Sequence, residues 1–163
     1  LFGYSDRMRF DLVINFLTGQ ATTNKKITIE GGDQWRPFIH VHDAARAYLA
    51  ALEKTPSKSN NILNLGGDDL NFQLKDIGNM IHNSIDNVKI NFTKNIDQRN
   101  YRVSFAKIKK ILKFEPEKNI DDGVREISSE LKFRKIQNWK NPIYYNNKFP
   151  FIGVSKLSKY YWQ

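Results

Sequence analysis

The stretch of sequence that decides the fold is Gln34-Trp35-Arg36-Pro37-Phe38-Ile39-His40-Val41-His42-Asp43-Ala44-Ala45-Arg46-Ala47. Its residues 36–41 form a short, mostly apolar extended segment. Asp43 follows as a predicted N-cap, because its carboxylate can accept a hydrogen bond from the free N–H groups of a first helical turn. Residues 44–53 are rich in alanine and leucine and predict a strong helix. An extended segment followed by a helix is the repeating unit of α/β folds.

The same alternation continues on both sides of this stretch. Apolar spacing predicts helices over residues 9–17, 75–85, 106–112 and 121–133, and strands over residues 26–30, 62–65 and 88–92. Gly19 is a predicted stop for the first of these helices, and Asp121 is a predicted cap for the last. The whole pattern predicts the α/β class.

Residues 62–65 bear on whether the sheet is complete. The segment is short and apolar on both faces, as a strand inside a covered parallel sheet would be. Such a strand needs parallel neighbours, which this sequence barely provides. Because the chain also begins with Leu1 rather than methionine, we expect it to be a fragment that lacks an N-terminal part.

Composition excludes several classes of protein. The 163 residues suffice for one domain, and 40% hydrophobic residues supply a sizeable core. The absence of cysteine excludes disulfides, cysteine nucleophiles and thiolate metal sites. No signal peptide opens the chain, and no apolar run approaches the roughly 18 residues of a membrane span. We therefore expect a cytoplasmic protein with no membrane partner.

The net charge of +9 leaves three interpretations open. The lysines are scattered and accompany many Asn and Ile residues, which is typical of AT-rich coding. A basic protein also attracts polyanions such as nucleic acid. A pocket for an anionic small molecule would need only two or three of these cations. Because no helix-turn-helix, zinc or RNA-recognition pattern is present, we expect no nucleic-acid partner.

Residues 34–47 resemble a signature of the extended short-chain dehydrogenases/reductases, the family of NAD-dependent nucleotide-sugar epimerases and dehydratases. There, an arginine, a short strand ending near Val-x-Asp and an alanine-rich helix follow in this order. Four further segments resemble the family's later or earlier motifs at suitable intervals: Leu1-Phe2-Gly3-Tyr4-Ser5, Ile62-Leu63-Asn64-Leu65-Gly66-Gly67, Asp97-Gln98-Arg99-Asn100-Tyr101-Arg102-Val103-Ser104 with Lys107, and Leu112-Lys113-Phe114-Glu115-Pro116. In the last of these, Lys113 replaces the family's usual glycine.

The resemblance covers residues 1–133 and implies the C-terminal, substrate-binding portion of an extended Rossmann-type enzyme. The remaining residues 134–163 read as an aromatic-rich C-terminal extension. The resemblance implies that NAD is held mainly by a missing N-terminal half, which would also supply the catalytic tyrosine and lysine. The isolated chain would then contain no catalytic residue and be inactive, and the full-length enzyme could be a homodimer. The alternative is a non-catalytic domain that binds nucleotide sugar or another protein.

The resemblance also assigns substrate-binding residues. A nucleotide sugar carries a diphosphate, and arginine suits it because its planar fork donates two parallel, charge-assisted hydrogen bonds to phosphate oxygens. The family pattern implies that Arg36 and Arg99 clamp this diphosphate from two sides. Arg102 is a close competitor of Arg99 for the role.

Five other positions are candidates by resemblance. Met8 and Arg9 precede the first predicted helix, where the family often touches its substrate and where free N–H groups suit an anion. Asn64 either hydrogen-bonds the nucleotide or orders its own loop. Gly3 and Tyr4 follow the point at which the family contacts the nicotinamide, so they are candidate cofactor contacts.

Other combinations of residues favour structural roles. His40 and His42 would point the same way on a strand, but no third ligand accompanies them, so no metal is expected. Arg46 is predicted to form a structural ion pair. Tyr144 and Lys148 have the spacing of the catalytic Tyr-x-x-x-Lys pair, but they stand in a late irregular segment, so we interpret the spacing as coincidence.

Overall fold

The computed structural model describes residues 1–54, 61–94, 99–133 and 135–146. Its main elements in chain order are α1 (Val13–Asn24), β1 (Lys26–Glu30), β2 (Trp35–Pro37), α2 (Val41–Lys54), β3 (Asn71–Gln73), α3 (Leu74–Ser84), β4 (Lys89–Thr93), α4 (Ala106–Leu112) and α5 (Ile120–Lys132). Short 3-10 helices span Asp68–Leu70 and Pro142–Tyr144. The predicted α/β class is confirmed. Among the described residues, no helix is long and apolar enough to cross a membrane.

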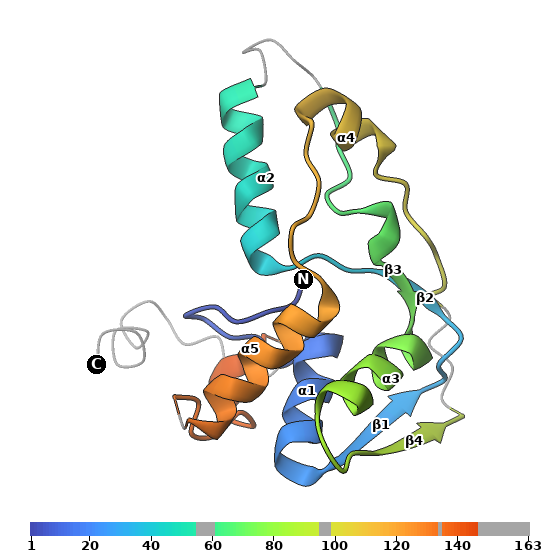
Figure 1. The fold of residues 1–163 in the computed structure, drawn as a ribbon, viewed down its shortest axis with the longest axis vertical. Helices are drawn as coiled ribbons and strands as arrows, with labels where there is room; N and C mark the ends of the chain where they lie inside the picture. The colour runs from blue at the N-terminus through green and yellow to red at the C-terminus, as the bar shows by residue number, and fades with distance from the viewer. Residues whose placement is uncertain (55–60, 95–98, 134, 147–163) are drawn as a thin grey trace.

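The strands form two separate pairs. β1 and β4 are parallel, in a register that runs from Lys26 opposite Lys89 to Glu30 opposite Thr93. β2 and β3 are antiparallel. An isolated parallel bridge joins Phe2 to His40. Figure 1 shows the β1–β4 pair at one end of the molecule, α2 and α4 at the other, and α5 crossing between them.

Three apolar clusters hold these elements together. The largest joins α1, β1, α3 and α5 through fully buried residues such as Ile27, Ile77 and Val124. A second lies between α2 and α4 and includes Ala47 and Leu112. Because each buried aliphatic side chain stabilises the fold by roughly 1.5–3 kcal/mol, these clusters fix the helices that carry the polar residues described below.

The third apolar cluster joins the start of the chain to residues 135–146. Trp139 packs against Phe10, with 5.5 Å between the two ring centroids. Its indole N–H donates to the Thr23 hydroxyl at 3.2 Å. The Phe10 N–H donates to the Tyr144 carbonyl at 2.9 Å. Residues 135–146 of the predicted aromatic extension therefore pack on the domain, while residues 147–163 lie outside the described part of the chain.

The first helix begins and ends later than predicted. The expected span was 9–17, whereas α1 runs through Gly19 and ends where Lys25 adopts a left-handed backbone, with φ 53°. Gly19 serves packing rather than termination. A Cβ built there would lie 3.1 Å from the Trp139 ring, so the missing side chain gives the indole its place against α1.

Both predicted aspartate caps are wrong. α2 begins at Val41, two residues before Asp43, and the Asp43 carboxylate accepts hydrogen bonds from outside the helix instead. α5 begins after Asn119, whose side chain caps the helix reciprocally with Asp122. The sequence contained this capping box, in which a side chain three residues on returns a bond to the cap.

The predicted strand at residues 62–65 is also wrong. Ile62 is 86% exposed, and its carbonyl accepts a hydrogen bond from the Lys107 ammonium group at 3.0 Å rather than from a neighbouring strand. A strand needs a partner for its backbone groups. No strand of the described residues lies beside this segment. Its apolar character alone was therefore insufficient to make it a strand.

Asp43 ties the start of α2 to the segment just before α5. Its side chain is fully buried and accepts N–H bonds from Glu117 at 3.1 Å and Lys118 at 2.9 Å, and it pairs with Arg46 at 2.7 Å. Burial raises the pKa of Asp43, but the Lys118, Glu117 and Arg46 donors outweigh it, so the pKa lies below its ordinary value. The predicted structural ion pair of Arg46 is confirmed.

Replacing Asp43 with alanine would leave two N–H groups and the Arg46 guanidinium without this acceptor. Because breaking a buried ion pair costs about 3–5 kcal/mol, we expect the free energy of unfolding in urea to fall by that amount. Asp86→Ala, a change in an exposed loop, is the control and should cost less than about 0.5 kcal/mol.

The Asp43 contribution also has a defined pH dependence. A carboxyl whose folded-state pKa is lowered stabilises the protein fully above its unfolded pKa, about 3.9, and loses this effect as the pH falls through the folded value. The stability difference between the wild type and Asp43→Ala should therefore be constant near neutrality and shrink below about pH 4. A difference that does not change down to the acid transition would contradict this assignment.

Lys113 ends α4 in a left-handed conformation, with φ 52°, which explains the glycine of the family motif at this place. A residue with a side chain is destabilised by about 1–2 kcal/mol in this left-handed conformation. Glycine avoids that cost, but it loses more conformational entropy on folding, which offsets part of the stabilisation. Lys113→Gly should raise the free energy of unfolding by up to about 1 kcal/mol. Lys110→Gly, inside the same helix, should lower it by about 1 kcal/mol.

Candidate functional site

Arg36 occupies the middle of β2 and is half-buried. Its Nη1 group donates to the Trp35 carbonyl at 2.7 Å and to the Arg99 carbonyl. The guanidinium carbon also lies 5.5 Å from the centre of the Tyr101 ring. These contacts hold the Arg36 cation in one place, against the segment that contains the second predicted arginine.

Residues 99–102 run beside β2. Asn100 accepts the Trp35 N–H at 2.9 Å, and the Trp35 carbonyl accepts the Tyr101 N–H at 3.3 Å. The Arg102 guanidinium stacks over the Trp35 indole at 4.6 Å. The structure thus brings together the three arginines that the sequence singled out, termed the arginine cluster below: Arg36, Arg99 and Arg102. Three cations on adjacent backbone form a surface that attracts anions.

Met8 and Arg9 lie elsewhere. In Figure 1 the segment after Phe2 loops out on the opposite side of α5 from β2. Met8 is 2% exposed in the apolar cluster of Phe10 and Trp139, and Arg9 forms a double hydrogen bond with Asp11 at 2.8 and 3.1 Å. Since α1 starts four residues after Arg9, its free N–H groups are not at these positions.

Asn64 is exposed, and its amide donates to the Ser104 carbonyl at 3.4 Å. The neighbouring Val103 N–H donates to the Asn71 side chain at 2.9 Å, next to β3. Asn64 therefore helps to order the backbone that follows Arg102, which agrees with the loop-ordering alternative.

Gly3 and Tyr4 form a second polar site, away from the arginine cluster. Gly3 has a left-handed backbone, with φ 100°, and the His40 ring occupies the place that a Cβ would take. Its N–H donates to the Asn15 side chain at 3.1 Å. The Tyr4 N–H donates to the Glu126 carboxylate at 3.4 Å.

Glu126 is a residue of this site that sequence reasoning missed. Its carboxylate lies 2.9 Å from His40 Nε2 and 3.2 Å from the Lys118 ammonium group. Burial raises the pKa of Glu126, but the bonds from His40, Lys118 and Tyr4 outweigh it and hold that pKa below its ordinary value. The only sequence signal was an acidic residue near the buried stripe of a predicted helix, and that signal is common.

The two histidines do not share a strand. His40 is buried at the Phe2 bridge, whereas His42 is exposed in the first turn of α2. Among the described residues, no three side chains of the His, Asp and Glu types gather as metal ligands. Tyr144 lies in a 3-10 helix, and the position of Lys148 is outside the described residues.

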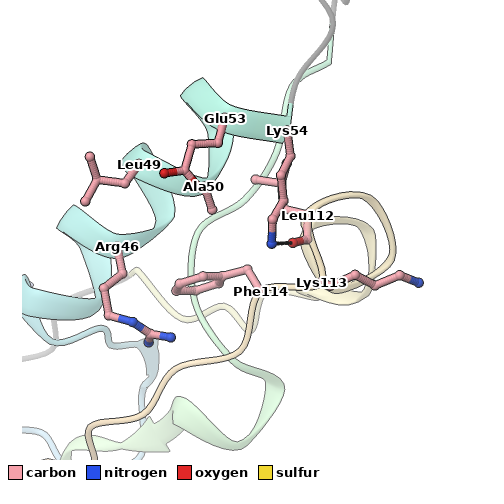
Figure 2. Close-up of a pocket in the computed structure, with 8 residues that line it drawn as sticks. All are labelled: Arg46, Leu49, Ala50, Glu53, Lys54, Leu112, Lys113 and Phe114. Carbon is pink, nitrogen blue, oxygen red and sulfur yellow. Dashed lines mark hydrogen bonds between the residues drawn. The ribbon is translucent and has the colours of Figure 1, made fainter.

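A hollow of about 290 Å³ lies between α2 and α4, as Figure 2 shows. Two of its three basic residues, Arg46 and Lys54, are engaged with the chain itself, and the third, Lys113, is exposed. The Lys54 ammonium group donates to the Leu112 carbonyl at 3.0 Å, and Arg46 stacks at 5.6 Å on Phe114 while it pairs with Asp43. We interpret this hollow as part of the packing between the two helices.

The sequence model of the NAD dependent epimerase/dehydratase family matches residues 2–66. That segment contains both Gly3–Tyr4 and Arg36, whereas Arg99 and Arg102 follow it.

Several solved structures of enzymes resemble this chain. A UDP-glucuronic acid 4-epimerase from Bacillus cereus, in complex with UDP-glucuronic acid and NAD, is 26% identical with a TM-score of 0.65, over 81% of this chain and 43% of that chain. RMD from Pseudomonas aeruginosa, complexed with NADPH, is 20% identical with a TM-score of 0.67, over 82% of this chain and 46% of that chain. An ADP-L-glycero-D-manno-heptose-6-epimerase from Helicobacter pylori is 18% identical with a TM-score of 0.62, over 73% and 37%. The chain spans less than half the length of these structures.

Proposed function

We propose that this chain forms the nucleotide-sugar-binding part of an NAD-dependent epimerase or dehydratase. The observation that carries the proposal is the arginine cluster, in which Arg36 of the family-matched segment meets Arg99 and Arg102 from a distant part of the chain. Coulombic attraction and charge-assisted hydrogen bonds both favour a diphosphate at such a surface.

The contacts of Arg36 give this recognition its geometry. Its Nη1 group is fixed by two backbone carbonyls, so the guanidinium loses little side-chain entropy when a ligand binds. Tyr101 and Trp35 provide apolar faces beside the cations, and a guanidinium stacked on an aromatic ring keeps its planar fork in one orientation. The guanidinium groups of Arg36 and Arg102 are therefore preorganised for a phosphate group.

The cofactor would be held mainly by another part of the enzyme. The described residues contain no glycine-rich turn between a strand and a helix, so only Gly3–Tyr4 fit an edge contact with NAD. When bound, NAD would accept a hydride from the sugar and return it. The residues of this chain would bind and orient the nucleotide diphosphate during that chemistry, in a cytoplasmic enzyme that could be a homodimer.

An exposed apolar stripe on α2 supports the proposal that another part of the enzyme covers this helix. Tyr48 is 71% exposed, Leu49 59% and Leu52 81%, and together they form one side of the helix. Such contiguous apolar surface marks an interaction site. The alternative function is a non-catalytic domain that binds nucleotide sugar or a protein partner, and it predicts the same stripe. An NAD-binding part in the full-length protein would favour the enzyme over this alternative.

Calorimetric titration with nucleoside diphosphates and their sugars tests the diphosphate site. Arg36→Ala should weaken binding by about 1.5–3 kcal/mol, the usual cost of a lost hydrogen bond to a charged group. Arg99→Ala and Arg102→Ala determine which of the two is the second half of the clamp. Arg125→Ala, which removes an exposed cation paired with Asp122, is the matched control. Equal affinity in all variants would exclude the arginine cluster as the site.

The apolar stripe should make the chain associate with itself when it is alone. We expect light scattering to show concentration-dependent aggregates of the wild type, and Leu49→Glu with Leu52→Glu to shift the chain toward monomer. Phe133→Glu changes an equally exposed apolar residue at the end of α5 and should have little effect. A monodisperse, cooperatively melting wild-type chain would argue against a missing cover for α2.

A further inference from the structure

Glu126 collects three hydrogen-bond donors from three separate segments of the chain. One carboxylate oxygen lies 2.9 Å from His40 Nε2 and 3.4 Å from the Tyr4 nitrogen, and the other lies 3.2 Å from the Lys118 ammonium group. The side chain is 32% exposed, so part of its charge is solvated and part is balanced by Lys118. A carboxylate can accept all of these bonds at once, because it carries about four acceptor sites.

The orientation of the His40 ring follows from its two partners. Its Nδ1 accepts the His42 N–H at 3.1 Å, so Nδ1 carries no proton. In the neutral imidazole the proton is then on Nε2, which donates to Glu126. The ring is 2% exposed and packs edge-on against Phe2 at 5.2 Å. The His42 N–H thus fixes the tautomer, and Glu126 holds the Nε2–H side of the buried imidazole.

Gly3 depends on the same ring. His40 occupies the place of a Gly3 Cβ, and the left-handed backbone at Gly3 directs the following peptide toward α5. There the Tyr4 N–H meets Glu126, while the Gly3 N–H is taken by Asn15. Both N–H groups of the segment are therefore used within the chain and are not available to a ligand.

We propose that Glu126 is a positioning residue for the Gly3–Tyr4 segment: by accepting from Tyr4 and His40 together, it fixes the backbone that would contact the cofactor. The cofactor contact itself rests on the proposed function above. With both N–H groups engaged, Gly3 and Tyr4 offer no N–H donor to an anion. Phosphate recognition would be left to the arginine cluster on the other side of α5.

Amide hydrogen exchange and imidazole nitrogen chemical shifts of the unliganded chain test this role by NMR. In Glu126→Leu, the Tyr4 amide should exchange roughly 10- to 100-fold faster, as expected when a bond to a charged acceptor is lost. The His40 Nε2–H loses its acceptor, so its nitrogen signal should shift and its proton should exchange faster, while Nδ1 still accepts from His42. Glu126→Gln retains an accepting oxygen and should restore most of the Tyr4 protection and of the His40 Nε2–H signal. Glu130→Leu, one turn further along α5, removes a carboxylate paired with Lys135 and should change neither signal.

The outcomes separate this role from the function on which it rests. Unchanged Tyr4 exchange and His40 signals in Glu126→Leu would overturn it, and so would equal losses in the Leu and Gln variants, because an accepting oxygen would then not hold the segment. If the nucleotide titrations fail while Glu126→Leu alone releases Tyr4 and His40, the positioning role stands and the nucleotide-sugar function does not.

Discussion

The buried carboxylate of Asp43 is the interaction on which the arrangement of the structure depends. A buried charge is tolerated only when several donors replace its lost hydration, and Asp43 obtains them from Glu117, Lys118 and Arg46. Two of these donors belong to the backbone just before α5. The orientation of α5 relative to α2 is therefore fixed by hydrogen bonds with defined directions, in addition to apolar packing, which is less directional.

The positions of both polar sites follow from this tie. Because α5 is held against the start of α2, Glu126 reaches His40, which directly precedes α2, and the N–H of Tyr4. Four residues before His40, Arg36 lies in β2 beside the segment from Arg99. One short stretch of sequence thus places the candidate diphosphate-binding cation and the ring that supports Gly3.

The two sites differ in the hydrogen-bonding groups that they leave available to a ligand. The arginine cluster offers charged donors on aromatic faces, whereas the Gly3–Tyr4 segment has its N–H groups engaged within the chain. A nucleotide diphosphate needs charged donors, which only the first of these two sites offers.

The sequence by itself determined the α/β class, the ranges of β1 and α4, the ion pair of Arg46 and the family resemblance, because periodicity and motif order are local properties of the chain. Local patterns did not determine where α1 ends, since the packing of Trp139 on Gly19 outweighs the preference of glycine to stop a helix. Nor did they determine the partners of Asp43, which come from 74 and 75 residues away, or the convergence of Glu126 on His40 and Tyr4. Only the tertiary structure decided these contacts, because a hydrogen bond between distant segments depends on how the helices pack, and one sequence carries no local record of that packing.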